Sequence, residues 1–182
     1  MEQLLRNPRK ARLPEKLIRG RCADRNIMNP QTLYNQSLDL LNGDGVKRNF
    51  EEAFKLNFKA AEYDYHDAVL AMGWFYLNGV GVPVDIEKAK SWYKKSAKQG
   101  DSKAMFSLGN ISYLQRNGSD ALRWFKRAVK QKHYRSIFWI GKLYWHGRGV
   151  REDKKKAMKL FNEAASHKVK EAQRTLQWLN RK

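Results

Sequence analysis

Residue types that could support catalysis or hold a metal are scattered along this chain. The four histidines are His66, His133, His146 and His167. None of them forms a Cys/His cluster with the spacing of zinc ligands, and Cys22, the one cysteine, is a thiol without a placed base. The glycine-rich turns at 79–82 and 147–150 lack the lysine and serine of a phosphate-binding loop. We therefore expect no catalytic site, no cofactor and no metal, and we expect that the protein is not an enzyme.

The distribution of charge suggests a second kind of chemistry, which is contact with anionic groups. The chain has 37 Lys and Arg against 18 Asp and Glu, a formal net charge of +19. Residues 101–182 hold 20 basic and six acidic side chains, whereas residues 29–100 hold nine of each. This asymmetry predicts a positive C-terminal half that attracts nucleic acid, an acidic protein or an acidic membrane. Basic residues on the second helix of successive predicted pairs form a set named the basic stripe here, which comprises Lys94, Lys95, Arg123, Lys126, Arg127 and Lys130.

The elements that must position these side chains recur along the sequence. Steps of 36 and 32 residues carry Gly73 to Gly109 and Gly141, and the preceding step of 36 leads back to Ser37. Columns of alanine and of large apolar residues keep the same register. Each unit reads as helix, glycine turn, helix, and one such hairpin cannot bury its apolar face alone. The sequence therefore predicts four stacked helix pairs and one last helix from about Val169.

Signals at the ends of the predicted helices set the boundaries of the units. We expect repeats over about 32–67, 68–103, 104–135 and 136–171, and a cap over 172–182. Asp85 and Asp153 are predicted N-caps, and Asn49 with Glu52 resembles a capping box. The third unit lacks the long glycine turn, so a shorter connection is expected there. Residues 1–28 are expected to form a basic N-terminal arm.

Taken together, these columns resemble the Sel-one-like repeat family. In the second unit the motif is Ala68, Met72-Gly73, Tyr76, the G-x-G-V turn at 79–82, Asp85, Lys88-Ala89 and Trp92-Tyr93. The resemblance covers about residues 30–175. It implies a right-handed α-solenoid related to tetratricopeptide repeats, which acts as a protein-binding adaptor and has no shared catalytic residues. Some relatives resemble immunity proteins encoded beside bacterial toxins, in which the solenoid blocks the toxin.

By analogy with tetratricopeptide repeats, one face of the first helix in each unit lines a concave groove. Positions −3, +1, +4 and +5 from the column glycine share that face at helical spacing. With flanking basic residues, the predicted partner-binding set is Leu70, Trp74, Lys103, Phe106, Asn110, Tyr113, Arg135, Phe138, Lys142, Trp145 and His146. Aromatic side chains and arginine usually contribute most of the binding energy at an interface. The alternative for these aromatic residues is ordinary packing between neighbouring repeats.

Two functions of different class follow from these features. The first is a non-catalytic adaptor that binds an acidic protein partner through the groove, for example an immunity protein that neutralises a bacterial toxin or effector. The second is nucleic-acid or anionic-surface binding through the basic stripe, which would be salt-sensitive and unspecific. The same stripe is also compatible with a solvated convex face. Without a run of about 18 apolar residues or an apolar signal core, and with one cysteine, we expect a cytoplasmic protein with no membrane span.

Overall fold

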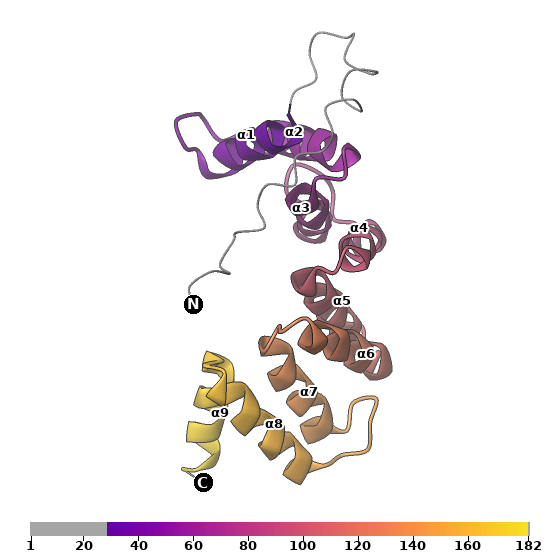
Figure 1. Ribbon diagram of the computed structural model, residues 1–182, viewed down its shortest axis with the longest axis vertical. Helices are drawn as coiled ribbons and strands as arrows, with labels where there is room; N and C mark the ends of the chain where they lie inside the picture. Colours follow the sequence, from indigo (N-terminus) through magenta and orange to yellow (C-terminus); the bar gives the residue numbers. More distant parts are fainter. Residues whose placement is uncertain (1–28, 182) are drawn as a thin grey trace, which may run out of the picture.

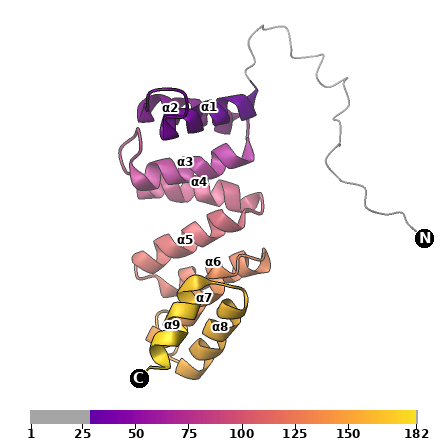
Figure 2. The ribbon, with the colours of Figure 1, turned by 90° about the vertical axis from the view of Figure 1, so that its left-hand side faces the viewer.

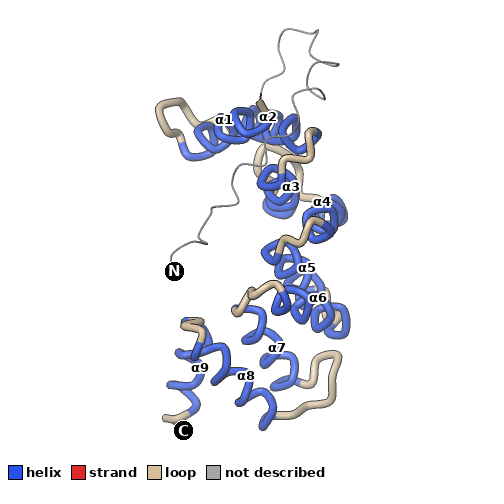
Figure 3. Tube along the Cα trace, in the orientation of Figure 1, coloured by secondary structure: helices blue, strands red, loops and turns tan. Residues whose placement is uncertain are grey.

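The computed structural model describes residues 29–181, and every regular element in that range is a helix (Figure 3). The helices are α1 (Pro30–Asn42), α2 (Phe50–Glu62), α3 (His66–Asn78), α4 (Ile86–Lys98), α5 (Ser102–Leu114), α6 (Gly118–Lys130), α7 (Arg135–His146), α8 (Lys154–Ser166) and α9 (Lys170–Leu179). The prediction of an all-α repeat fold with four helix pairs and a last helix is confirmed. The predicted N-terminal arm, residues 1–28, lies outside the described residues.

The helices pack as consecutive pairs that stack in one direction. The pairs are α1 with α2, α3 with α4, α5 with α6, and α7 with α8, and α9 packs on α8. Together they form an arc, with α3, α5, α7 and α9 toward its inner side and α4 and α6 on its outer side (Figure 1). Figure 2 looks onto the inner side. The first helix of each unit is therefore placed where the groove residues were predicted.

The predicted N-caps form, although the expected capping box is incomplete. The side chains of Asn49, Asp85 and Asp153 each accept a hydrogen bond from the backbone N–H three residues later, at 2.8–3.1 Å. In a capping box the Glu52 carboxylate would bond to the Asn49 N–H. That N–H instead donates to the carbonyl oxygen of Leu40 at 3.0 Å. A carbonyl group in the last turn of α1 thus accepts the hydrogen bond that the glutamate was expected to accept.

The column glycines allow the two helices of a pair to approach closely. Each faces a buried aromatic side chain of its partner helix, in the pairs Gly73–Tyr93, Gly109–Phe125 and Gly141–Phe161. A Cβ atom on Gly73 would lie only 2.6 Å from the Tyr93 ring, closer than two non-bonded carbon atoms pack. Glycine against an aromatic ring is therefore the packing rule of three of the four pairs.

The first pair departs from this rule at both positions. Ser37 stands where the others have glycine, and Asn57 stands where the others have a ring. Both are buried. The Ser37 hydroxyl donates to the Ala53 carbonyl oxygen at 2.7 Å, and the Asn57 amide donates to the Ala68 carbonyl oxygen at 3.0 Å. Two small polar side chains therefore replace the ring in the core nearest the N-terminal end of the arc.

None of the helices in residues 29–181 combines the length and the apolar character that crossing a lipid bilayer requires.

Candidate partner-binding groove

Two pockets are formed by the inner helices, one toward each end of the arc. The N-terminal pocket has a volume of about 410 Å³ and is lined mainly by α1, α3 and α5. The C-terminal pocket has a volume of about 310 Å³ and is lined by α7, α8 and α9. Seven of the eleven predicted groove residues line them, namely Leu70, Trp74 and Lys103 in the first and Phe138, Lys142, Trp145 and His146 in the second.

Three of the predicted aromatic residues pack around Trp139 of α7, two of them from the preceding repeat. The rings of Phe106, Tyr113 and Phe138 lie 6.4, 5.1 and 6.3 Å from the ring of Trp139, measured between centroids. Phe138 is only 7% exposed. Trp74, in contrast, is 43% exposed and lines the N-terminal pocket. Phe106 and Tyr113 therefore pack between neighbouring repeats, and Phe138 is nearly buried within its own. Trp74 offers accessible aromatic surface.

Lys142 is a half-buried cation in the middle of an aromatic cluster. Its Nζ atom lies 4.4 Å from the centre of the Trp139 ring and 5.5 Å from that of Tyr113, within the range of cation–π attraction. Burial lowers the pKa of the Lys142 ammonium group, and the nearby Arg148 lowers it further. Within residues 29–181, none of the ion pairs includes Lys142. An anionic group brought to this point would therefore meet a charge that the described chain leaves uncompensated.

Arg135 and Asn110 line neither pocket, and they differ in whether their polar atoms have partners. The Arg135 guanidinium forms an ion pair with Glu171 of α9 and lies 5.5 Å from the Phe106 ring. Its charge is therefore already partnered. Asn110 is partly buried, and its Oδ1 atom has no hydrogen-bond partner among the described residues. The same holds for Nε1 of Trp139, so this part of the groove keeps one unused acceptor and one unused donor.

The basic stripe lies on the outer helices α4 and α6, and half of it is engaged locally. These local contacts are Lys95 with Asp64, Arg123 with Asp120, and Arg127 over the ring of Trp124. Lys94, Lys126 and Lys130 are exposed and take part in no ion pair within the described chain. The stripe thus carries less uncompensated charge than its sequence suggests.

The sequence did not identify Asn57 and Trp139 as groove residues. Asn57 lines the N-terminal pocket, and Trp139 is the ring around which the middle of the groove is built. The signal for Asn57 was present as an exception, because it replaces the large aromatic residue of its column. Trp139 follows a buried phenylalanine on α7, and only the contact with the preceding repeat shows its role.

No group of three or more His, Cys, Asp or Glu side chains in the described range is placed to hold a metal ion.

Comparisons with known proteins agree with this architecture. A family model described as the Sel1 repeat matches residues 40–62, 66–101, 102–133 and 135–169. Among curated proteins, the chitin synthase regulator SKT5 of Malassezia restricta is 38% identical over 61 residues, which cover 34% of this chain and 4% of that protein.

Two solved structures resemble most of the chain. A Sel1 repeat protein from Oxalobacter formigenes has 30% sequence identity and a TM-score of 0.73, covering 80% of this chain and 61% of that one. A protective antigen of uropathogenic Escherichia coli strains, which displays an SLR fold, has 27% identity and a TM-score of 0.74, covering 83% and 33%. The chain therefore spans less than two thirds of the length of each protein named here.

Proposed function

The chain belongs to the Sel1 repeat family, whose repeats mediate protein–protein interactions, and we propose that it is a non-catalytic adaptor for an acidic protein. The partner binds along the inner side of the arc, across the two pockets. An immunity protein that neutralises a bacterial toxin or effector is one concrete form of this proposal.

The observation that carries the proposal is the environment of Lys142. A partly buried ammonium group without a carboxylate is destabilising, and burial already lowers its pKa. A partner carboxylate placed beside it would form a charge-assisted hydrogen bond in a site where water is partly excluded. Arg148, whose guanidinium lies 4.8 Å from the Tyr113 ring, adds a second cation at the same point.

Affinity would come mainly from apolar and aromatic surface, and charge would supply steering. Trp74 and Trp145 line opposite pockets and are large enough to act as anchors. The net charge of +14 over residues 101–182 would raise the rate of encounter with an acidic protein, and salt would reduce that effect.

A pull-down from the cells that encode this protein, at two salt concentrations and with or without nuclease, tests the proposal. Wild-type protein should retain an acidic protein after nuclease treatment, and less of it at high salt. Trp74→Ala with Trp145→Ala should weaken capture at least about thirtyfold, because each removes an anchor. Lys142→Glu should also weaken capture. Lys155→Glu makes the same change of charge at an exposed lysine of α8 outside both pockets, and this control should leave capture unchanged.

Binding through the basic stripe is the alternative that the same pull-down can detect. Replacing Lys126, Arg127 and Lys130 with Glu should leave capture through the inner side intact. If these substitutions abolish capture, or if only nucleic acid is recovered, the outer face is the binding surface and the proposal is wrong.

A further inference from the structure

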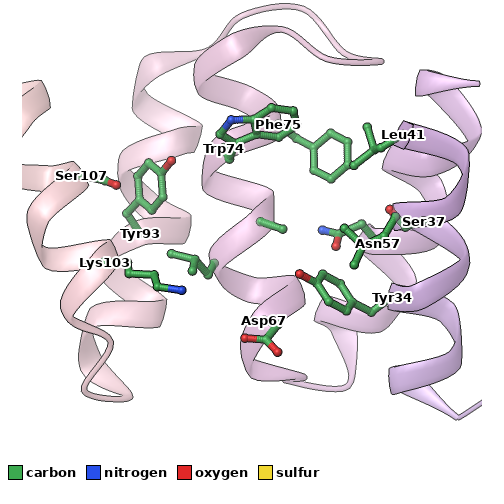
Figure 4. A pocket seen from close by; sticks show the side chains of 13 residues that line it. Tyr34, Ser37, Leu41, Asn57, Asp67, Trp74, Phe75, Tyr93, Lys103 and Ser107 are labelled. Atoms are coloured by element: carbon green, nitrogen blue, oxygen red, sulfur yellow. The ribbon is translucent and has the colours of Figure 1, made fainter. Parts of the chain in front are cut away.

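The N-terminal pocket borders the one repeat that lacks the ring that fills the core of the other three. Asn57 takes the column position of Tyr93, Phe125 and Phe161, and it lines the pocket together with Ser37 (Figure 4). An asparagine side chain is much smaller than a phenyl ring. We therefore expect the pocket to accept an aromatic group like the ring that the chain itself places at this position in every other pair.

Asn57 also leaves one hydrogen-bonding atom unused at this place. Its Nδ2 atom donates to the Ala68 carbonyl oxygen at 3.0 Å, which fixes the orientation of the amide. Its Oδ1 atom is buried and has no partner among the described residues. Buried acceptors are almost always paired, so this one calls for a donor from outside the described chain.

The walls of the pocket favour a flat apolar group. Leu41, Leu70, Trp74 and Phe75 form the apolar part, and Asp67 and Lys103 stand at one side (Figure 4). A buried lysine or arginine head group would need several acceptors and a countercharge. Asp67 is exposed and only one buried acceptor is unpaired, so a cationic side chain fits poorly.

We infer that the N-terminal pocket receives a tryptophan or tyrosine side chain of the bound protein, with its N–H or O–H group donating to Oδ1 of Asn57. This inference rests on the proposed function, since it names the residue type by which the partner is anchored. Tryptophan and tyrosine combine a large apolar body with one donor, which is the combination that this pocket lacks. Phenylalanine or leucine would fill the volume but leave the acceptor unpaired.

Small aromatic probes test the donor directly by NMR. Titration with 3-methylindole, the side chain of tryptophan, should shift the indole N–H signal of Trp74, with a dissociation constant of about 1 mM, as is usual for so small a ligand. The matched probe 1,3-dimethylindole has the same ring but no donor. It should bind about tenfold more weakly, because the Asn57 acceptor then stays unpaired.

Two variants locate the site. Ser37→Gly with Asn57→Phe copies the Gly109–Phe125 pair of the third repeat, so it should fold, fill the pocket and abolish binding of both probes. Asn57→Leu removes the acceptor and keeps the wall apolar, so the two probes should then bind equally. If the double variant binds 3-methylindole as wild type does, or if wild type binds the two probes equally, the inference is overturned.

A blocked amino acid separates a protein side chain from a free small molecule. N-acetyltryptophanamide carries the same ring between two amide groups and should shift the same Trp74 signal. If 3-methylindole binds and the blocked residue does not, the pocket is a small-molecule site, and its assignment to a partner side chain is wrong. These titrations use no partner protein, so their failure is distinct from the failure of the pull-down.

Discussion

At the scale of single residues, every repeat holds one residue in the left-handed region after its second helix. These residues are Asp64, Gly100, Lys132 and Lys168, with φ of 56°, 92°, 62° and 61°. They are spaced by 36, 32 and 36 residues, whereas the column positions Ser37, Gly73, Gly109 and Gly141 are spaced by 36, 36 and 32, because the third repeat is shortened between its two helices. The residue type indicates this conformation only at Gly100, because glycine adopts it without steric cost. The backbone thus keeps a geometry that three of the four side chains disfavour.

Removing the Cβ atom at these positions should stabilise the protein. Lys132→Gly should raise the free energy of unfolding by about 0.5–1 kcal/mol, since relief of left-handed strain exceeds the added chain entropy. Gly100→Ala should lower it by about 1 kcal/mol, and a Cβ there meets no atom within 4 Å, so the change reports backbone strain alone. Urea unfolding measures both. A stability loss in Lys132→Gly would contradict the strain argument.

A partly buried histidine should make stability depend on pH. Burial lowers the pKa of His133, and the positive charge of Arg135 adds to the effect. The ring packs 4.6 Å from that of Phe106, and Nδ1 lies 2.9 Å from the Ser136 hydroxyl. The unfolded chain therefore binds a proton at this histidine more readily than the folded protein does. As a result, the contribution of neutral His133 to the free energy of unfolding is complete above pH about 6.5 and declines as the pH falls toward the lowered pKa.

The difference between wild type and His133→Gln isolates this residue from the other titrating groups. Thermal unfolding between pH 5 and 8 should show a steeper loss on acidification for wild type than for the variant. Superimposable pH profiles would show that the histidine is not desolvated in the folded protein.

At the scale of elements, the second glycine of the G-x-G-V turn joins one repeat to the previous one. A Cβ on Gly81 would overlap the carbonyl oxygen of Phe50, at the start of α2, and a Cβ on Gly149 would overlap the backbone of Gly118 and Ser119, at the start of α6. The sequence predicted the turns and most helix limits, because caps and glycines are local signals. It did not predict this contact, which depends on how far apart successive pairs stack.

Gly45 provides a matched control for Gly81, because it has the same turn position and a similar φ. Its φ is 71°, against 66° for Gly81, but a Cβ on Gly45 would meet no atom within 4 Å. Gly45→Ala should therefore cost only the backbone strain, about 1–2 kcal/mol. Gly81→Ala should cost about 1–3 kcal/mol more, because the helix start must move. Equal losses in urea unfolding would mean that the contact between repeats contributes nothing.

At the scale of the whole molecule, the inner side of the arc differs in charge between its two ends. The N-terminal pocket is bounded by a neutral half of the chain, and Lys142 and Arg148 lie toward the strongly positive half. The repeat register predicted eleven residues on one face of the first helices, of which seven line the two pockets. It was not enough to predict the N-terminal pocket, where Asn57 replaces a ring, or the cluster of Phe106 and Tyr113 around Trp139.

Photo-crosslinking in the source cells tests most directly whether the inner side is the binding surface. The photoreactive residue p-benzoylphenylalanine is placed at position 74, on the inner side, or at position 126, on the outer side; both native side chains are exposed. If the inner side binds the partner, position 74 forms a covalent adduct with one acidic protein and position 126 forms none. Adducts formed only from position 126 would contradict binding at the inner side.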